Sequence, residues 1–94
     1  MNQEEAGQVT LVLSHNLPTG EVRVYHIEST KVDFFVATFV NEGGGQLPWG
    51  VAPSPEGALF HASETWEANL PGQVNPFSVV YNLLLGKIQT YEEA

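Results

Sequence analysis

The sequence predicts a small α+β domain in which a three-stranded antiparallel sheet is followed by two helices. Three observations predict it: apolar and polar residues alternate in the first forty positions, glycine and proline are concentrated in the middle, and helical periodicity follows. The chain has 94 residues, the usual length of one domain, and 43% of them are apolar, which is enough for a core. We therefore expect a single domain over residues 1–94, with residues 1–8 flexible.

Three segments, at about 9–15, 21–28 and 32–41, are predicted to be strands. The third reads VDFFVATFV and is rich in the β-branched and aromatic residues that favour strands. Pro18 and Gly20 separate the first two segments and are typical turn formers. Because the connections between consecutive strands are short, the segments predict an antiparallel meander.

The strands are apolar on both faces. Hydrophobicity assigns to a helix-covered face Val9, Leu11, Leu13, Val22, Val24, Phe34 and Val36. It assigns to the other face Val12, Tyr25, Ile27, Phe35, Ala37 and Phe39. Since the second face is too apolar to lie comfortably in water, we expect something to cover it.

The segment after the strands is predicted to be a long loop over 43–54. Residues 43–57 read GGGQLPWGVAPSPEG, in which eight of fifteen residues are Gly or Pro. The loop nevertheless carries Leu47, Trp49 and Val51. Two interpretations stay open: the loop folds over the second sheet face and Trp49 joins the core, or the loop is free and Trp49 anchors a partner.

A short helix is predicted over about 55–69. Ser54 is a suitable N-cap, and Pro55 suits the first helical position. A hairpin formed by 58–62 and 65–69 is the alternative.

A C-terminal helix is predicted over about 76–91, with Asn75 as its cap. Its apolar residues repeat at spacings of four and three, at Phe77, Tyr81, Leu84, Ile88 and Tyr91. Val79 and Leu83 fall on the opposite side of this helix, so it too is apolar on two sides.

The charge balance excludes some classes of partner. Eleven acidic residues stand against three basic ones, for a net charge of −8. Three cations, Arg23, Lys31 and Lys87, are too few to neutralise a nucleic-acid backbone or to adhere to an anionic membrane. A basic protein surface would be attracted. Since the sequence contains no signal-peptide pattern and no apolar run of membrane-spanning length, we expect a cytoplasmic protein.

The motifs of catalysis and of cofactor or metal binding are missing from the sequence. It has no cysteine, and His15, His26 and His61 form no HxH, HxxxH or HExxH pattern. The GGG run at 43–45 is not followed by the lysine of a phosphate-binding loop, and no GxSxG elbow occurs. We expect no enzymatic activity, no cofactor and no metal.

Two functional hypotheses remain. The first is a small acidic interaction module of inhibitor, immunity or nucleic-acid-mimic type, which docks on a basic protein surface through Leu47, Trp49, Val51, Glu64 and Glu67. The second is a self-associating structural subunit whose interface contains Phe35, Phe39, Val79 and Leu83. An enzyme that borrows residues across a dimer, starting from Arg23, Tyr25 and His26, is the weakest alternative.

Overall fold

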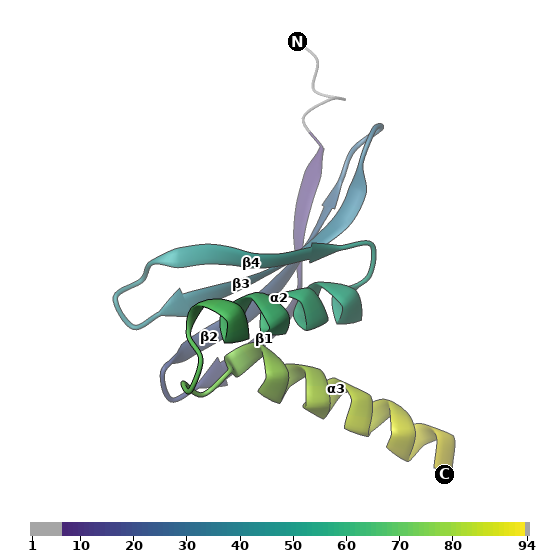
Figure 1. The fold of residues 1–94 in the computed structure, drawn as a ribbon. Coiled ribbons are helices and arrows are strands. Elements are labelled where there is room, and N and C mark those ends of the chain that lie inside the picture. Colours follow the sequence, from purple (N-terminus) through teal and green to yellow (C-terminus); the bar gives the residue numbers. More distant parts are fainter. Residues whose placement is uncertain (1–6, 94) are drawn as a thin grey trace.

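The computed structural model describes the backbone of residues 7–93 and the side chains of residues 7–85. Four strands form one antiparallel sheet in chain order: β1 (Gln8–Leu17), β2 (Gly20–Glu28), β3 (Asp33–Asn41) and β4 (Gln46–Ala52). Two helices, α2 (Pro55–Asn69) and α3 (Pro76–Glu93), lie on one face of this sheet (Figure 1). The predicted α+β class, the antiparallel sheet and both helices are confirmed. Of the lead-in expected to be flexible, residues 1–6 lie outside the described residues, and Gln8 already belongs to β1.

The prediction of three strands was wrong by one, because the segment taken as a loop over 43–54 contains β4. This strand pairs with β3, and the register shifts between Ala37 and Thr38. Proline and glycine are tolerated in β4 because it is an edge strand and contains a bulge. The segment extends the sheet sideways, so it neither covers the second sheet face nor stays free, and one sheet face stays open. Trp49 does join the core, as the first interpretation predicted.

A bulge in β1 changes which side chains face the helices. Leu11 pairs with Tyr25, but Leu13 pairs with Val24, so that Val12 is the extra residue. Leu13 therefore shares a face with the fully buried Val24, whereas Leu11 lies on the opposite face. The prediction that Val9, Leu11 and Leu13 share one face was wrong, because a bulge reverses the alternation along a strand.

The faces of β3 are the reverse of those predicted. Phe39 pairs with Val22, and Ala37 pairs with Val24; both valines are fully buried. Phe35, Ala37 and Phe39 therefore face the helices, and Phe34 and Val36 face away from them. Because side chains alternate along a strand, a one-residue error in register transfers the whole set to the wrong face.

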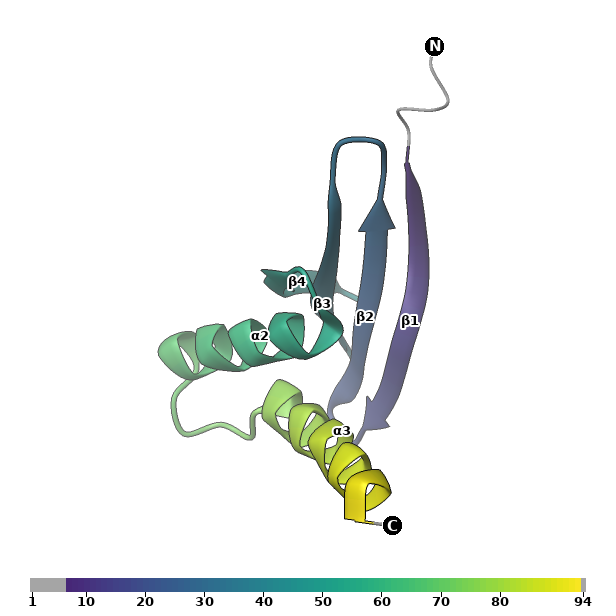
Figure 2. The same cartoon turned by 90° about the vertical axis from the view of Figure 1, so that its right-hand side faces the viewer.

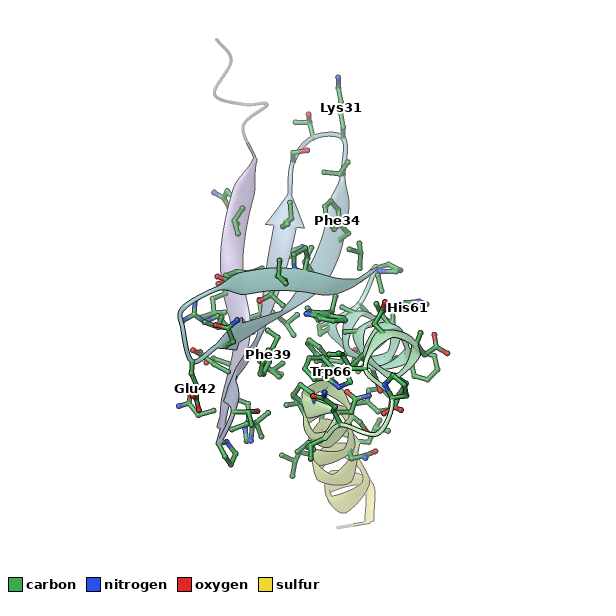
Figure 3. The ribbon with its side chains drawn as sticks, turned by 60° about the vertical axis from the view of Figure 1, so that its left-hand side comes forward. Lys31, Phe34, Phe39, Glu42, His61 and Trp66 are labelled. Atoms are coloured by element: carbon green, nitrogen blue, oxygen red, sulfur yellow. The ribbon has the colours of Figure 1, made fainter. Side chains whose placement is uncertain are left out.

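The core lies between the sheet and the helices and is built around four aromatic rings. Trp66 of α2 lies 5.0 Å from Trp49, 5.5 Å from Phe39 and 5.9 Å from Phe77, measured between ring centroids. Figure 3 shows Phe39 and Trp66 pointing towards one another across this layer. Such pairs contribute about 0.5–1.5 kcal/mol beyond the area they bury. The rings join β3, β4, α2 and α3 into one unit.

Both helices begin at the caps that the sequence predicts. Ser54 Oγ accepts a hydrogen bond from Gly57 N at 3.0 Å, and Pro55 occupies the first helical position. Asn75 Oδ1 accepts hydrogen bonds from Phe77 N at 3.1 Å and from Ser78 N at 3.2 Å. The hairpin alternative for 58–69 was therefore wrong.

On α3, Phe77 and Val80 are buried, while Val79 and Leu83 are exposed on the other side of the helix, as predicted. Ile88 and Tyr91, the far end of the predicted stripe, lie beyond the described side chains. Neither α2 nor the described part of α3 is long and apolar enough to cross a membrane.

Candidate interaction surface

The sheet face opposite the helices is uncovered. We call it the open face and define it by its apolar side chains: Val9, Leu11, Tyr25, Ile27, Phe34, Val36, Pro48 and Val51. Val9, Leu11 and Val51 each expose about half or more of their surface. Figure 1 shows both helices on the other side of the sheet, so no described element covers this face. An apolar surface of this extent is typical of an interaction site.

A shallow depression of about 350 Å³ lies in the open face. Its lining residues are Val9, Tyr25, Ile27, Val36, Thr38, Gln46 and Pro48, which come from all four strands. None of these side chains is charged at neutral pH. The depression therefore suits apolar side chains of a partner better than an ionic ligand.

Tyr25 is held in place at the side of this depression. Its hydroxyl oxygen accepts hydrogen bonds from Gln46 Nε2 at 2.9 Å and from Arg23 Nη1 at 3.2 Å. Gln46 Nε2 also donates to Thr38 Oγ1 at 2.9 Å. The hydrogen bond from Gln46, and then that from Arg23, lowers the pKa of Tyr25 below its usual value. The ring thus presents its apolar body in a fixed orientation.

Among the described side chains, Arg23 is the cation of the open face, and it is paired with an acid. Arg23 Nη2 donates to Glu21 Oε1 at 3.0 Å, and Ser14 Oγ donates to Glu21 Oε2. The hydrogen bond from Arg23, and then that from Ser14, lowers the pKa of Glu21, and Glu21 in turn raises the pKa of Arg23. The pair leaves the open face close to neutral within a strongly acidic chain.

The structure does not gather the predicted partner-binding residues on one surface. Val51 belongs to the open face, and Leu47 is exposed on β4. Trp49 lies on the other side of the sheet, against Trp66 and Phe77. Glu64 and Glu67 are exposed on α2, in the helix layer. Sequence reasoning predicted a second apolar face and placed Tyr25 and Ile27 on it, but it missed the other residues of the open face because these are identified only by the register of β3, by the pairing of β4 and by the bulge in β1.

The residues predicted for self-association do not lie on one surface either. The placement of Phe35 and Phe39 on an uncovered face was wrong, because both pack against the buried core. Val79 and Leu83 are 37% and 49% exposed on α3. Of the four residues predicted for self-association, only Val79 and Leu83 are therefore exposed to a partner.

One cluster of possible metal ligands was also missed. His26, Glu28 and Asp33 lie at the end of the β2–β3 hairpin with one ligand atom each within 4.8 Å of the others. Their closeness follows from the register, in which Glu28 is directly opposite Asp33. His26 Nε2 already contacts Asp33 Oδ1 at 2.7 Å, its ring stacks on Phe35, and Asp33 is 67% exposed. The hydrogen bond between His26 and Asp33 explains the closeness of these two side chains.

Comparison of the chain with protein-family models, with curated proteins and with solved structures finds no match. Packing within the described residues gives the open face no role. Its chemistry is apolar at the centre, with one oriented tyrosine and a neutralised arginine beside it.

Proposed function

We propose that this chain is a small acidic protein-interaction module without catalytic activity, of inhibitor, immunity or nucleic-acid-mimic type, which binds a basic protein surface through its open face. The observation that carries the proposal is the open face itself, where exposed apolar side chains of β1 and β4 and half-buried ones of β2 and β3 lie beside Tyr25. Burying such a surface contributes about 25 cal/mol for each Å² removed from water.

Tyr25 supports the proposal as the anchor of this surface. Tyrosine is enriched among the residues that dominate binding energy, because its ring is large and has few torsions to order. Here the hydrogen bonds from Gln46 and Arg23 fix the hydroxyl before a partner arrives. A side chain ordered in advance loses less entropy on binding.

The charge distribution supports a basic partner. Acidic residues stand at both ends of the central hairpin: Glu42 and the Arg23-paired Glu21 at one end, and Glu28 and Asp33 at the other, where their register places them on the helix-facing side of the sheet. Acidic residues near an interface accelerate encounter with an oppositely charged surface and add less to the final affinity. The net charge of −8 acts in the same direction.

The test is affinity capture from host lysate at low salt with three forms of the chain. Val51→Asp places a charge in the open face at a side chain that is 54% exposed, so the fold should persist. Val74→Asp is the matched control, because Val74 is 78% exposed in the connection between the helices. We expect the wild type and the control to capture the same protein and Val51→Asp to lose it. Equal capture by all three forms contradicts the proposal.

The electrostatic attraction between the chain and its partner is tested in a separate measurement. Once the captured protein has been purified, the rate at which it associates with the chain should fall steeply as ionic strength rises from about 10 to about 150 mM, while the dissociation rate changes little. An association rate that is independent of salt would remove the basic surface from the proposal and leave the apolar contact.

A further inference from the structure

The two edges of the sheet differ in how they are protected against pairing. β4 carries Pro48 and Gly50 and a bulge, which are common devices against edge-to-edge association. β1 reads QVTLVLSHNL and contains no proline, glycine, lysine, arginine or carboxylate over its ten residues. After the bulge at Val12, the segment from Leu13 to Leu17 pairs regularly with β2, and its outer edge meets no strand of residues 7–93.

An apolar groove runs alongside this segment. α3 begins against α2 and β2 and then leads away from the sheet (Figure 2). The space of about 320 Å³ between β1 and α3 is lined by Leu13, Ser14, His15, Val80, Leu83 and Leu84. The outer edge of β1 and this groove lie next to each other and form one continuous surface.

The chain is more extended than a compact domain of its length. Its radius of gyration is 14.5 Å, whereas a compact domain of this length has a value of about 12 Å. The excess comes from the hairpin end, which extends past the helices, and from α3, which extends past the sheet (Figure 1).

The charge distribution of the chain indicates which partner fits the edge of β1 and the groove. Two copies with a charge of −8 each repel one another over most of their surfaces. β1 is a strip without acids, so two copies can meet along it without placing carboxylates face to face. A basic partner, by contrast, would find no carboxylate on β1 itself with which to pair. The uncharged edge is therefore best suited to a second copy of this chain.

We propose that β1 pairs antiparallel with β1 of a second copy around a two-fold axis, which continues the sheet across both protomers. The segment Leu13–Leu17 forms the new ladder. α3 of the second copy lies on the same side of the continued sheet and closes the groove with the apolar side that carries Val79 and Leu83. The axis is perpendicular to the sheet, so both open faces point in the same direction and the dimer presents two docking surfaces to partners.

The first experiment measures mass by light scattering after size exclusion, from about 1 μM to about 1 mM protein, the range of moderate to weak affinities. We expect the wild type to approach twice the 10.3 kDa of one chain as its concentration rises. A mass of one chain throughout this range overturns the proposal.

Two variants locate the interface. Asn16→Lys places a lysine on the exposed edge of β1, and Leu83→Asp places a carboxylate in the groove. Their matched controls are Leu47→Lys, on the other edge strand, and Val74→Asp, in the exposed connection between the helices. We expect both interface variants to be monomeric and both controls to dimerise. The two variants change the net charge in opposite directions, so charge alone does not explain a shared effect. A dimer that survives either interface variant overturns the pairing.

Hydrogen exchange of the wild type tests the ladder without a variant. Amide exchange in residues 13–17 should slow as protein concentration rises, whereas exchange in β4 should not change. Exchange in 13–17 that is the same at monomeric and dimeric concentrations overturns the ladder. Val51→Asp, which tests the open face, should leave the mass unchanged, so failure of the docking proposal is distinguishable from failure of this one.

Discussion

Gly50 of β4 lies directly beneath Ala62 of α2, with no room for a side chain between them. A Cβ on Gly50 would come within 3.0 Å of the backbone of Ala62 and of the carbonyl oxygen of Ala58. These are backbone atoms of a packed helix, so they cannot move aside as a flexible side chain can. The close approach allows Trp49 and Trp66 to meet.

Gly50→Ala should therefore destabilise the fold by at least the roughly 1–3 kcal/mol typical of overpacking, because the whole helix must shift. The measurement is the urea midpoint of unfolding. Gly43→Ala is the control: its Cβ would meet Asn41 Oδ1 at an ordinary 3.4 Å. Equal midpoints for the two variants would contradict the close packing of α2 on β4.

Local signals in the sequence were sufficient to predict both helices. Ser54 and Asn75 each cap a helix by contacting residues two or three positions away, so the chemistry of the cap can be read without the rest of the fold. The turn at Pro18 is local in the same way. The predicted helix over 55–69 agrees with the structure at both ends.

Predicting the sheet correctly required information about residues that are far apart in the sequence. The face on which Phe35 lies is set by its pairing with His26, and the faces of Val9 and Leu11 are set by the bulge at Val12. Neither follows from the alternation of apolar residues when both faces are apolar. β4 was missed because Gly50 and Pro48 are typical of a loop unless the edge position of the strand is known. The sequence predicted a second apolar face and placed Tyr25 and Ile27 on it, but the residues that β1, β3 and β4 contribute to the open face depend on these three features and could not be predicted.

Asn75 has more partners than a cap requires, and its replacement should be correspondingly costly. Besides accepting the two cap hydrogen bonds, its Nδ2 donates to Ser63 O and Ser63 Oγ at 3.0 Å and to Glu67 Oε2 at 3.1 Å. Asn75→Ala should cost about 2–3 kcal/mol, the sum of a lost cap and of the part-buried hydrogen bonds that the Asn75 amide donates to α2.

The matched comparison is Ser54→Ala, which loses one cap hydrogen bond and should cost about 1 kcal/mol. Asn75→Asp keeps the acceptor but replaces the donor with a carboxylate beside Glu67, and it should be destabilised at pH 7 and less so in acid. The measurement is thermal or urea unfolding at both pH values. Similar losses for Asn75→Ala and Ser54→Ala would show that Asn75 acts only as a cap.

Glu21 should contribute to the pH dependence of stability. Its pKa in the folded chain is below the ordinary 4.5, because of hydrogen bonds from Arg23 and then Ser14. The unfolded state therefore binds more protons, so the stabilisation is present above pH 4.5 and is lost as the pH falls through the lowered pKa. Glu21→Gln should lose less stability between pH 7 and pH 3 than the wild type. Glu42→Gln, at an exposed turn residue, is the control, and identical pH profiles for the wild type and Glu21→Gln would contradict the linkage.

Tyr25 should report directly on the hydrogen-bond network of the open face. The hydrogen bond from Gln46, and then that from Arg23, stabilises the phenolate and lowers the pKa of Tyr25 below 10.0. Gln46→Leu removes the larger cause and should move the pKa upward while leaving Arg23 in place. The measurement is the ultraviolet absorbance of phenolate during alkaline titration, with Tyr25→Phe identifying which part of the signal belongs to this residue. If the Tyr25 titration is the same in the wild type and in Gln46→Leu, the ring is not held by Gln46, and the open face loses its ordered anchor.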